Sequence, residues 1–333
     1  MINALRSGWN WLPIFVRAIV MGLVVFEIGS DLTAIPLFGN LKFHPEIPWA
    51  LPVALLLLGL YWAYFSGWGP PNSTRDARRT ASRKGLVSAS LWLAALPAAA
   101  SGTLMLILLR LVAPYVMPVA APAVKIQLSS YPPATVIGLL LSIAVIAAVT
   151  EELAYRGYMQ KTMEDRYGVV PAILVSGIMF WIAHLPDVTI THLPGHLAAS
   201  AVFGLLAYLT RSLWPAIAAH AVADLILQPA YLYHAPQFAW TALSARPLWG
   251  GGAPTTLDQK LEAIWAAMKP ENLLASDSRQ LFAILSWLFV LSVAATVFSF
   301  LGLARESRRE RRSAVDDVRV PRRPAHPSAD GRA

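Results

Sequence analysis

The sequence contains no cysteine and few charged residues. Without cysteine, the chain cannot form disulfides, use a thiolate nucleophile or hold zinc or an iron–sulfur cluster through sulfur. Charged residues make up 14% of the 333 residues and hydrophobic residues 56%, whereas soluble proteins carry about 25% charged residues. The mean hydropathy is +0.52. This composition excludes an ordinary soluble domain and favours an integral membrane protein.

The chain contains long runs of apolar residues. Eight of them approach the ~20 residues that a helix needs to cross the hydrocarbon core of a bilayer. They are rich in Leu and Ala and lack the alternation of a β-strand, and only helices or closed barrels satisfy the backbone in lipid. We therefore predict an all-α, polytopic membrane protein of about eight transmembrane helices, with the site inside the helical bundle. The predicted spans are Trp11–Ser30, Ile47–Trp68, Leu86–Val112, Ala134–Tyr155, Val169–Leu185, Leu193–Thr210, Trp214–Tyr233 and Leu281–Ala304.

Lysine and arginine fall mainly in alternate short loops. The intervening short loops hold only Lys42 and Lys125. By the positive-inside rule the basic loops face the cytoplasm, and eight crossings then place both termini there. We expect a multi-pass protein of the bacterial inner membrane. The basic loop residues are Arg75, Arg78, Arg79, Arg83, Lys84, Arg156, Lys161, Arg166 and Arg211.

Much of the net charge of +8 comes from the C-terminal tail, which has nine Arg against five Asp and Glu and no aromatic residue. Such a tail is typical of a disordered topology signal with weak contact to anionic lipid, and we expect no nucleic-acid partner. The predicted organisation is N-terminal transmembrane helices with a basic cytoplasmic loop (1–133), a catalytic helical core (134–234), an extracytoplasmic loop with an amphipathic helix (235–280), the last transmembrane helix (281–304) and the disordered basic tail (305–333).

Three polar clusters lie in successive apolar runs. They are Glu151–Arg156 (Glu-Glu-Leu-Ala-Tyr-Arg), Phe180–His184 (Phe-Trp-Ile-Ala-His) and His220–Asp224 (His-Ala-Val-Ala-Asp). An ionisable group at membrane depth costs roughly 3 kcal/mol on insertion scales, so the recurrence of such groups indicates a functional site. The clusters therefore predict an intramembrane reaction centre.

Helical spacing predicts partners within the first cluster. Glu152 and Arg156 are four residues apart, with the acid on the N-terminal side, which is the favourable order for an ion pair. Glu151 is turned about 100° away and lacks that partner. A carboxylate with no adjacent cation is suited to deprotonating a water molecule as a general base. The simpler interpretation is that both acids cap the end of the span.

The other two clusters supply histidines at matching depth. Phe180 and His184 share a helix face, and an antiparallel hairpin places His184 within one turn of the level of Glu151. His220 and Asp224 form a third pair at a spacing of four. Simpler interpretations are an interfacial His184 and a local His220–Asp224 hydrogen bond. We predict instead that Glu151, His184 and His220 converge.

The order Glu-Glu-x-x-x-Arg, Phe-x-x-x-His and His-x-x-x-Asn/Asp on successive spans resembles the CPBP family. This family comprises the type II CAAX prenyl endopeptidases and their bacterial bacteriocin-processing and Abi relatives. The resemblance covers about Ala134–Tyr233. It implies a membrane-embedded, glutamate-dependent peptidase that hydrolyses a peptide bond of a membrane-associated or lipidated protein or peptide.

The resemblance also implies roles for individual residues. Glu151 matches the glutamate that activates the attacking water, with His184 assisting it, and His220 and Asp224 match the pair that stabilises the oxyanion. Asp224 departs from the Asn of the family, because an ionised Asp cannot donate a hydrogen bond. Either Asp224 is protonated or it orients His220. The supporting positions are Glu152, Arg156 and Phe180.

Two alternatives stay open. Glu151, His184 and His220 form a plausible His-His-Glu zinc set, although the chain lacks His-Glu-x-x-His and the resemblance implies catalysis without a metal or other cofactor. The second alternative is a non-proteolytic membrane scaffold or immunity protein of the same fold. His192 and His196 are also four residues apart, and we interpret them as interfacial residues. The expected partners are a membrane-associated substrate and the lipid bilayer.

Overall fold

A computed structural model describes Trp9, residues 11–116, 131–185 and 188–232, Gln259, Ala266 and residues 278–319. In these residues the regular structure is helical and no strand occurs, so the predicted all-helical class is confirmed. The elements are α2 (Ile14–Phe43), α3 (Ala50–Phe65), η1 (Asn72–Thr74), α4 (Arg75–Ala81), α5 (Ala89–Val116), α6 (Pro133–Glu151), η3 (Glu152–Gln160), α7 (Lys161–Tyr167), α8 (Val169–Ala183), η4 (Ile190–His192), α9 (Leu193–Thr210), α10 (Trp214–Leu232) and α13 (Ser278–Arg319).

Helix length and composition support a multi-pass membrane protein. Five helices in the described ranges are long and apolar enough to cross a bilayer, namely Ile14–Phe43, Ala89–Ala113, Pro133–Tyr167, Ile190–Thr210 and Gln280–Val315. Shorter apolar helices at Ala50–Phe65, Val169–Ala183 and Trp214–Leu227 coincide with the three other predicted spans. The count of eight crossings stays a prediction.

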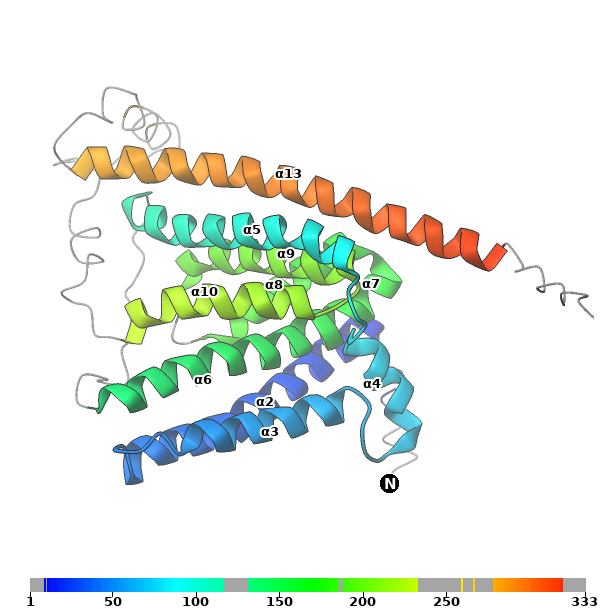
Figure 1. The fold of residues 1–333 in the computed structure, drawn as a ribbon, viewed down its shortest axis with the longest axis horizontal. Helices are drawn as coiled ribbons and strands as arrows, with labels where there is room; N and C mark the ends of the chain where they lie inside the picture. The colour runs from blue at the N-terminus through cyan, green and yellow to red at the C-terminus, as the bar shows by residue number, and fades with distance from the viewer. Residues whose placement is uncertain are drawn as a thin grey trace, which may run out of the picture.

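The helices lie roughly side by side (Figure 1). In this view α13 runs along α5 on one side of the bundle, and α2 and α3 lie on the opposite side. Helices α6, α8, α9 and α10 occupy the space between them. Because α6, η3 and α7 follow one another without a break, Pro133–Tyr167 is a single helix of 35 residues through the bundle. The three polar clusters therefore lie on central helices.

Helix α2 approaches this central helix at glycine positions. A Cβ atom at Gly29 would lie 2.7 Å from Thr150 Cγ2 and 2.8 Å from Tyr61 Cζ. At Gly22 it would lie 2.7 Å from Met159 Cε. These contacts are closer than a real side chain tolerates, so the glycines permit the backbone of α2 to lie directly against the segment that begins beside Glu151.

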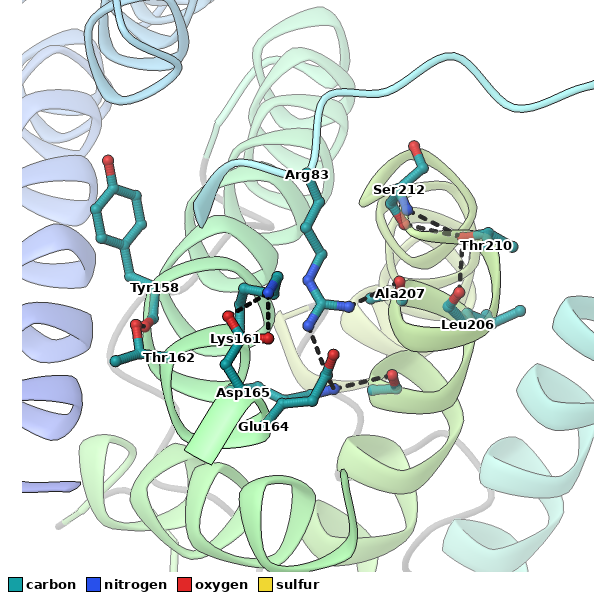
Figure 2. A network of polar contacts seen from close by, with 12 residues as sticks. Arg83, Tyr158, Lys161, Thr162, Glu164, Asp165, Leu206, Ala207, Thr210 and Ser212 are labelled. Atoms are coloured by element: carbon teal, nitrogen blue, oxygen red, sulfur yellow. Dashed lines mark hydrogen bonds and ion pairs between the residues drawn. The ribbon is translucent and has the colours of Figure 1, made fainter. Parts of the chain in front are cut away.

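A buried arginine fixes the segment after α4 to the ends of two core helices (Figure 2). Arg83 donates from Nη1 to the Ala207 carbonyl at 2.9 Å and from Nη2 to Glu164 Oε2 at 2.6 Å. Its own carbonyl accepts a hydrogen bond from the Leu213 N–H at 3.2 Å. Arg83 is 6% exposed and has a φ of 41°, a backbone conformation that is uncommon for a non-glycine residue. These contacts join α7, α9 and the α9–α10 turn at the α4 end of the bundle.

The last helix corrects the predicted boundary of the C-terminal tail. We predicted a span that ends at Ala304 and disorder over 305–333, but α13 continues to Arg319. Extending an existing helix avoids the cost of nucleation. The extension is also docked, because Ser307 Oγ donates to the Leu209 carbonyl at 2.7 Å. Residues 320–333 and nearly all of the predicted amphipathic helix in 235–280 lie outside the described residues.

Candidate active site

Three helices bring Glu151, His184 and His220 together. Glu151 is the last residue of α6 and is 8% exposed. Its Oε1 lies 4.0 Å from His184 Nε2, at the end of α8, and its Oε2 lies 3.6 Å from His220 Nε2 on α10. The predicted convergence of these side chains is confirmed. Each distance leaves the carboxylate close to an imidazole without a direct hydrogen bond.

The Glu-Glu pair lies where the helix changes its winding. Residues Glu152–Gln160 form a π-helix, in which hydrogen bonds span five residues, and all nine residues are buried. π-Helical segments are rare and occur frequently at functional sites. The α-helical spacing assumed from the sequence therefore ends at Glu151.

The Glu152 carboxylate contacts both Arg156 and His220. Its Oε2 lies 3.4 Å from Arg156 Nε, and both side chains are fully buried. Its Oε1 lies 2.8 Å from His220 Nδ1. A carboxylate only accepts hydrogen bonds, so an ionised Glu152 fixes the proton on Nδ1 and turns Nε2 of His220 toward the site. The sequence predicted the ion pair with Arg156 but gave no sign of the contact with His220, which lies 68 residues away.

His220 is held on several sides. Its Nε2 lies 3.6 Å from Asp224 Oδ2, the same distance as from Glu151 Oε2. Its ring stacks on Phe203 at a centroid distance of 4.8 Å and an interplanar angle of 11°. Glu152 therefore orients the imidazole through Nδ1 while Asp224 and Glu151 face the other nitrogen. The predicted pair of His220 and Asp224 is present, and Glu152 is an additional partner.

His184 has one ring nitrogen committed to the backbone. Its Nδ1 lies 2.7 Å from the Phe180 carbonyl, which only accepts, so Nδ1 carries the proton and donates. In the neutral ring, Nε2 then presents a lone pair toward Glu151. The Phe180 ring meets the His184 ring edge-on at 4.9 Å. The predicted shared face of these two residues is thereby confirmed.

His196 lies beside this centre. Its ring centroid is 5.2 Å from that of His184 and 5.2 Å from that of Phe180. Its Nδ1 donates to the His192 carbonyl at 2.9 Å, and His192 is only 5% exposed. His192 is buried and His196 is half-buried, so both pack against protein beside the centre, and their interfacial position in the bilayer stays a prediction. Their spacing of four was the available sign that they share one helix face.

Arg156 is enclosed by aromatic rings. Its guanidinium carbon lies 4.9 Å from the centroid of Phe180, 5.6 Å from that of Phe203 and 5.9 Å from that of Tyr155. The residue is fully buried, and its guanidinium nitrogens have no hydrogen-bond partner among the described residues. Its charge is thus balanced by the Glu152 carboxylate and by the faces of the rings.

Tyr155 is a residue that the sequence interpretation missed. It is fully buried, and its hydroxyl has no hydrogen-bond partner in the part of the chain that the structure describes. Its ring packs between Phe26 at 5.6 Å and Phe180 at 5.2 Å. Tyr155 follows Glu151 by four residues, which was a usable sign in the sequence. A buried hydroxyl without a partner among the described residues thus lies on the same continuous helix as the candidate base.

The zinc alternative depends on a set of ligands. Among the described residues, no group of three or more His, Asp or Glu side chains is arranged so that it could hold a metal ion. Whether the reaction needs a metal ion is therefore tested by chelation and by the addition of zinc.

The architecture and the enclosed polar centre together define a multi-pass membrane protein with a buried site of carboxylates and histidines. Residues 133–226 match the family model described as type II CAAX prenyl endopeptidase Rce1-like. This is the family that the three motifs resemble, and the matched residues include all three of them. Comparison with curated proteins and with solved structures gives no match.

Proposed function

We propose that the protein is an intramembrane endopeptidase in which Glu151 activates a water molecule for attack on a peptide bond. The observation that carries the proposal is the position of Glu151, whose two carboxylate oxygens face His184 and His220 from different helices. Both contacts lie inside the region that matches a family of CAAX endopeptidases.

In the proposed first step, a water oxygen forms a bond to the scissile carbonyl carbon while one water proton passes to Glu151. His184 Nε2 accepts a hydrogen bond from the same water, because its Nδ1–H is already engaged by the Phe180 carbonyl. The carbonyl π electrons move to oxygen and give a tetrahedral oxyanion. The role of the protein in this step is to hold the water and receive its proton.

In the proposed second step, the oxyanion collapses, the C–N bond breaks and the proton on Glu151 passes to the departing nitrogen. His220 in its doubly protonated form stabilises the oxyanion with a hydrogen bond from Nε2–H, while its Nδ1–H donates to Glu152. The products are a carboxylic acid and an amine, and Glu151 returns to its carboxylate form.

The proposed substrate is a membrane-associated or lipidated protein or peptide. The candidate site lies on apolar helices, so a substrate that is itself held at the bilayer reaches it without a large desolvation cost. The test is to incubate the purified full chain with a peptide library in lipid nanodiscs and to identify new termini by mass spectrometry. Cleavage that Glu151→Gln lacks supports the proposal. Equal cleavage by both proteins would contradict the role of Glu151, and the absence of new termini with the wild type would instead favour a non-proteolytic scaffold.

Asp224→Asn tests the second member of the oxyanion pair. We expect this variant to keep most of the turnover, because the amide supplies a permanent N–H donor in nearly the same volume. The measurement is kcat over a range of pH. A loss of about 100- to 1,000-fold at every pH would contradict the donor role and indicate that the negative charge of Asp224 orients His220.

Tyr155→Phe tests whether the buried hydroxyl contributes to the reaction. The substitution keeps the ring contacts with Phe26 and Phe180 and removes a hydroxyl that has no partner among the described residues. We expect kcat to fall about tenfold, the rate equivalent of one hydrogen bond to the bound water or oxyanion, and the free energy of unfolding to stay unchanged.

Tyr158→Phe is the matched control for this experiment. The Tyr158 hydroxyl donates to the Phe65 carbonyl at 2.7 Å, so its removal leaves a buried acceptor unpaired. We expect the free energy of unfolding to fall by about 1 kcal/mol and kcat per folded molecule to stay unchanged. Full turnover of Tyr155→Phe, or equal losses of stability in both variants, would show that Tyr155 is only structural.

A further inference from the structure

Helix α13 presents one continuous exposed stripe along its length. In its apolar part the stripe contains Leu291, Phe298 and Leu301, which are 61%, 74% and 49% exposed. At the same spacing of three and four residues it continues with exposed arginines. The face that meets lipid tails thus changes into a basic face. We call these four arginines the outer arginine face, and they are Arg305, Arg308, Arg309 and Arg312.

The depth of the outer arginine face matches the lipid headgroups. The apolar part of α13 from Leu281 to Leu303 extends about 34 Å at ~1.5 Å per residue, and the hydrocarbon core of a bilayer is about 30 Å thick. Arg305 follows at once, and Arg312 lies about 10 Å farther along the axis. The arginines therefore cover the headgroup layer and the adjoining water.

The opposite side of the extension is already occupied by protein. Ser307 Oγ donates to the Leu209 carbonyl at 2.7 Å, and Glu310 accepts from Ser90 Oγ at 2.8 Å. Arg311 lies over the Tyr208 ring at 5.8 Å. These contacts dock the extension on the ends of α5 and α9. They also orient the outer arginine face away from the bundle.

The acidic residues of this segment leave the outer face strongly positive. Glu310 is engaged by Ser90 on the docked side. Glu306 lies 3.8 Å from Arg309, whose side chain is still 80% exposed. Over residues 305–312 the chain carries five arginines and two glutamates, so this segment has a net positive charge at headgroup depth.

We propose that the outer arginine face binds the phosphates of anionic phospholipids. Guanidinium groups bind phosphate oxygens in pairs of parallel hydrogen bonds, which distinguishes them from a simple point charge. Each basic residue close to an anionic membrane surface raises the affinity of a protein for that surface roughly fivefold. The opposite side of the same helix is docked on α5 and α9. Lipid bound to the outer arginine face therefore helps to keep the extension of α13 in its docked position.

The experiment compares two arginines on opposite sides of the same helix. The full chain is purified in a neutral detergent and titrated with phosphatidylglycerol or with phosphatidylcholine, and bound lipid is counted by native mass spectrometry. We expect wild type to bind phosphatidylglycerol at least tenfold more tightly than phosphatidylcholine. Arg309→Gln lowers this affinity about fivefold, and Arg311→Gln, two residues away on the docked side, leaves it unchanged.

A fourfold variant and two competitor ligands complete the test. Substituting Gln at all four positions of the outer arginine face is expected to abolish the preference for phosphatidylglycerol, and Arg309→Gln provides the answer should this variant not fold. Wild-type affinity in Arg309→Gln, or an equal loss in Arg311→Gln, would overturn the proposal. Stronger binding of inorganic phosphate or of a short DNA duplex than of phosphatidylglycerol would also overturn it.

Discussion

Replacing Glu151 by Gln is expected to abolish peptide hydrolysis while the protein still inserts and folds. The amide keeps the size and shape of the side chain but cannot accept the water proton. Loss of a general base costs about 100- to 10,000-fold in rate. The measurement is kcat with any peptide that the wild type cleaves, at equal amounts of folded protein in the membrane.

Glu164→Gln is the control for this experiment. Glu164 also forms a contact with a cation, but it pairs with Arg83 at the α4 end of the bundle, outside the proposed centre. We expect this variant to lose stability and to keep its kcat. Full activity of Glu151→Gln would exclude glutamate catalysis. Loss of wild-type activity on exhaustive chelation, with recovery on addition of zinc, would support the metal alternative.

Replacing Arg156 by Met is expected to lower the free energy of unfolding by about 3–5 kcal/mol, because it leaves the fully buried Glu152 carboxylate without its cation. Methionine occupies a similar volume between the rings of Phe180 and Phe203, so loss of packing is small. The same change is expected to reduce kcat, since Glu152 also orients His220. Unfolding is measured by titration with a denaturing detergent in mixed micelles.

The double variant Glu152→Gln with Arg156→Met separates charge from packing. When both partners are neutral, no uncompensated charge remains, and we expect the double variant to be more stable than Arg156→Met alone. The coupling energy from the four proteins then measures the ion pair directly. A loss below about 1 kcal/mol in the single variant, or additive losses in the double variant, would show that the pair contributes little.

The helical, membrane-embedded class of the protein follows from local properties of the chain. A continuous apolar run such as Leu193–Thr210 has only one way to satisfy its backbone in lipid, and α9 has the same bounds. Spacing along one helix likewise predicted the contacts of Glu152 with Arg156 and of Phe180 with His184. Each pair lies within about one turn of its own segment, even though Glu152 and Arg156 are in the π-helix, so the pairs can be predicted without knowledge of the neighbouring helices.

Helix ends were less predictable. The charged residues after Ala304 predicted disorder, but α13 continues through them because Ser307 and Glu310 find partners on α9 and near the start of α5. Those partners lie about 100 and 220 residues earlier in the chain. No local pattern contains this information.

The orientation of the candidate site depends on how the helices pack. His220 Nδ1 is held by Glu152, His196 packs against His184, and the Phe180 and Phe203 rings that cover Arg156 come from two other helices. Each of these contacts joins residues that are distant in sequence, and it forms only when α6, α8, α9 and α10 pack at one particular rotation and depth. A sequence pattern fixes which residues share a face of one helix. The relative rotation of two helices is set by the shapes of all the side chains between them, and it therefore appears only in the folded structure.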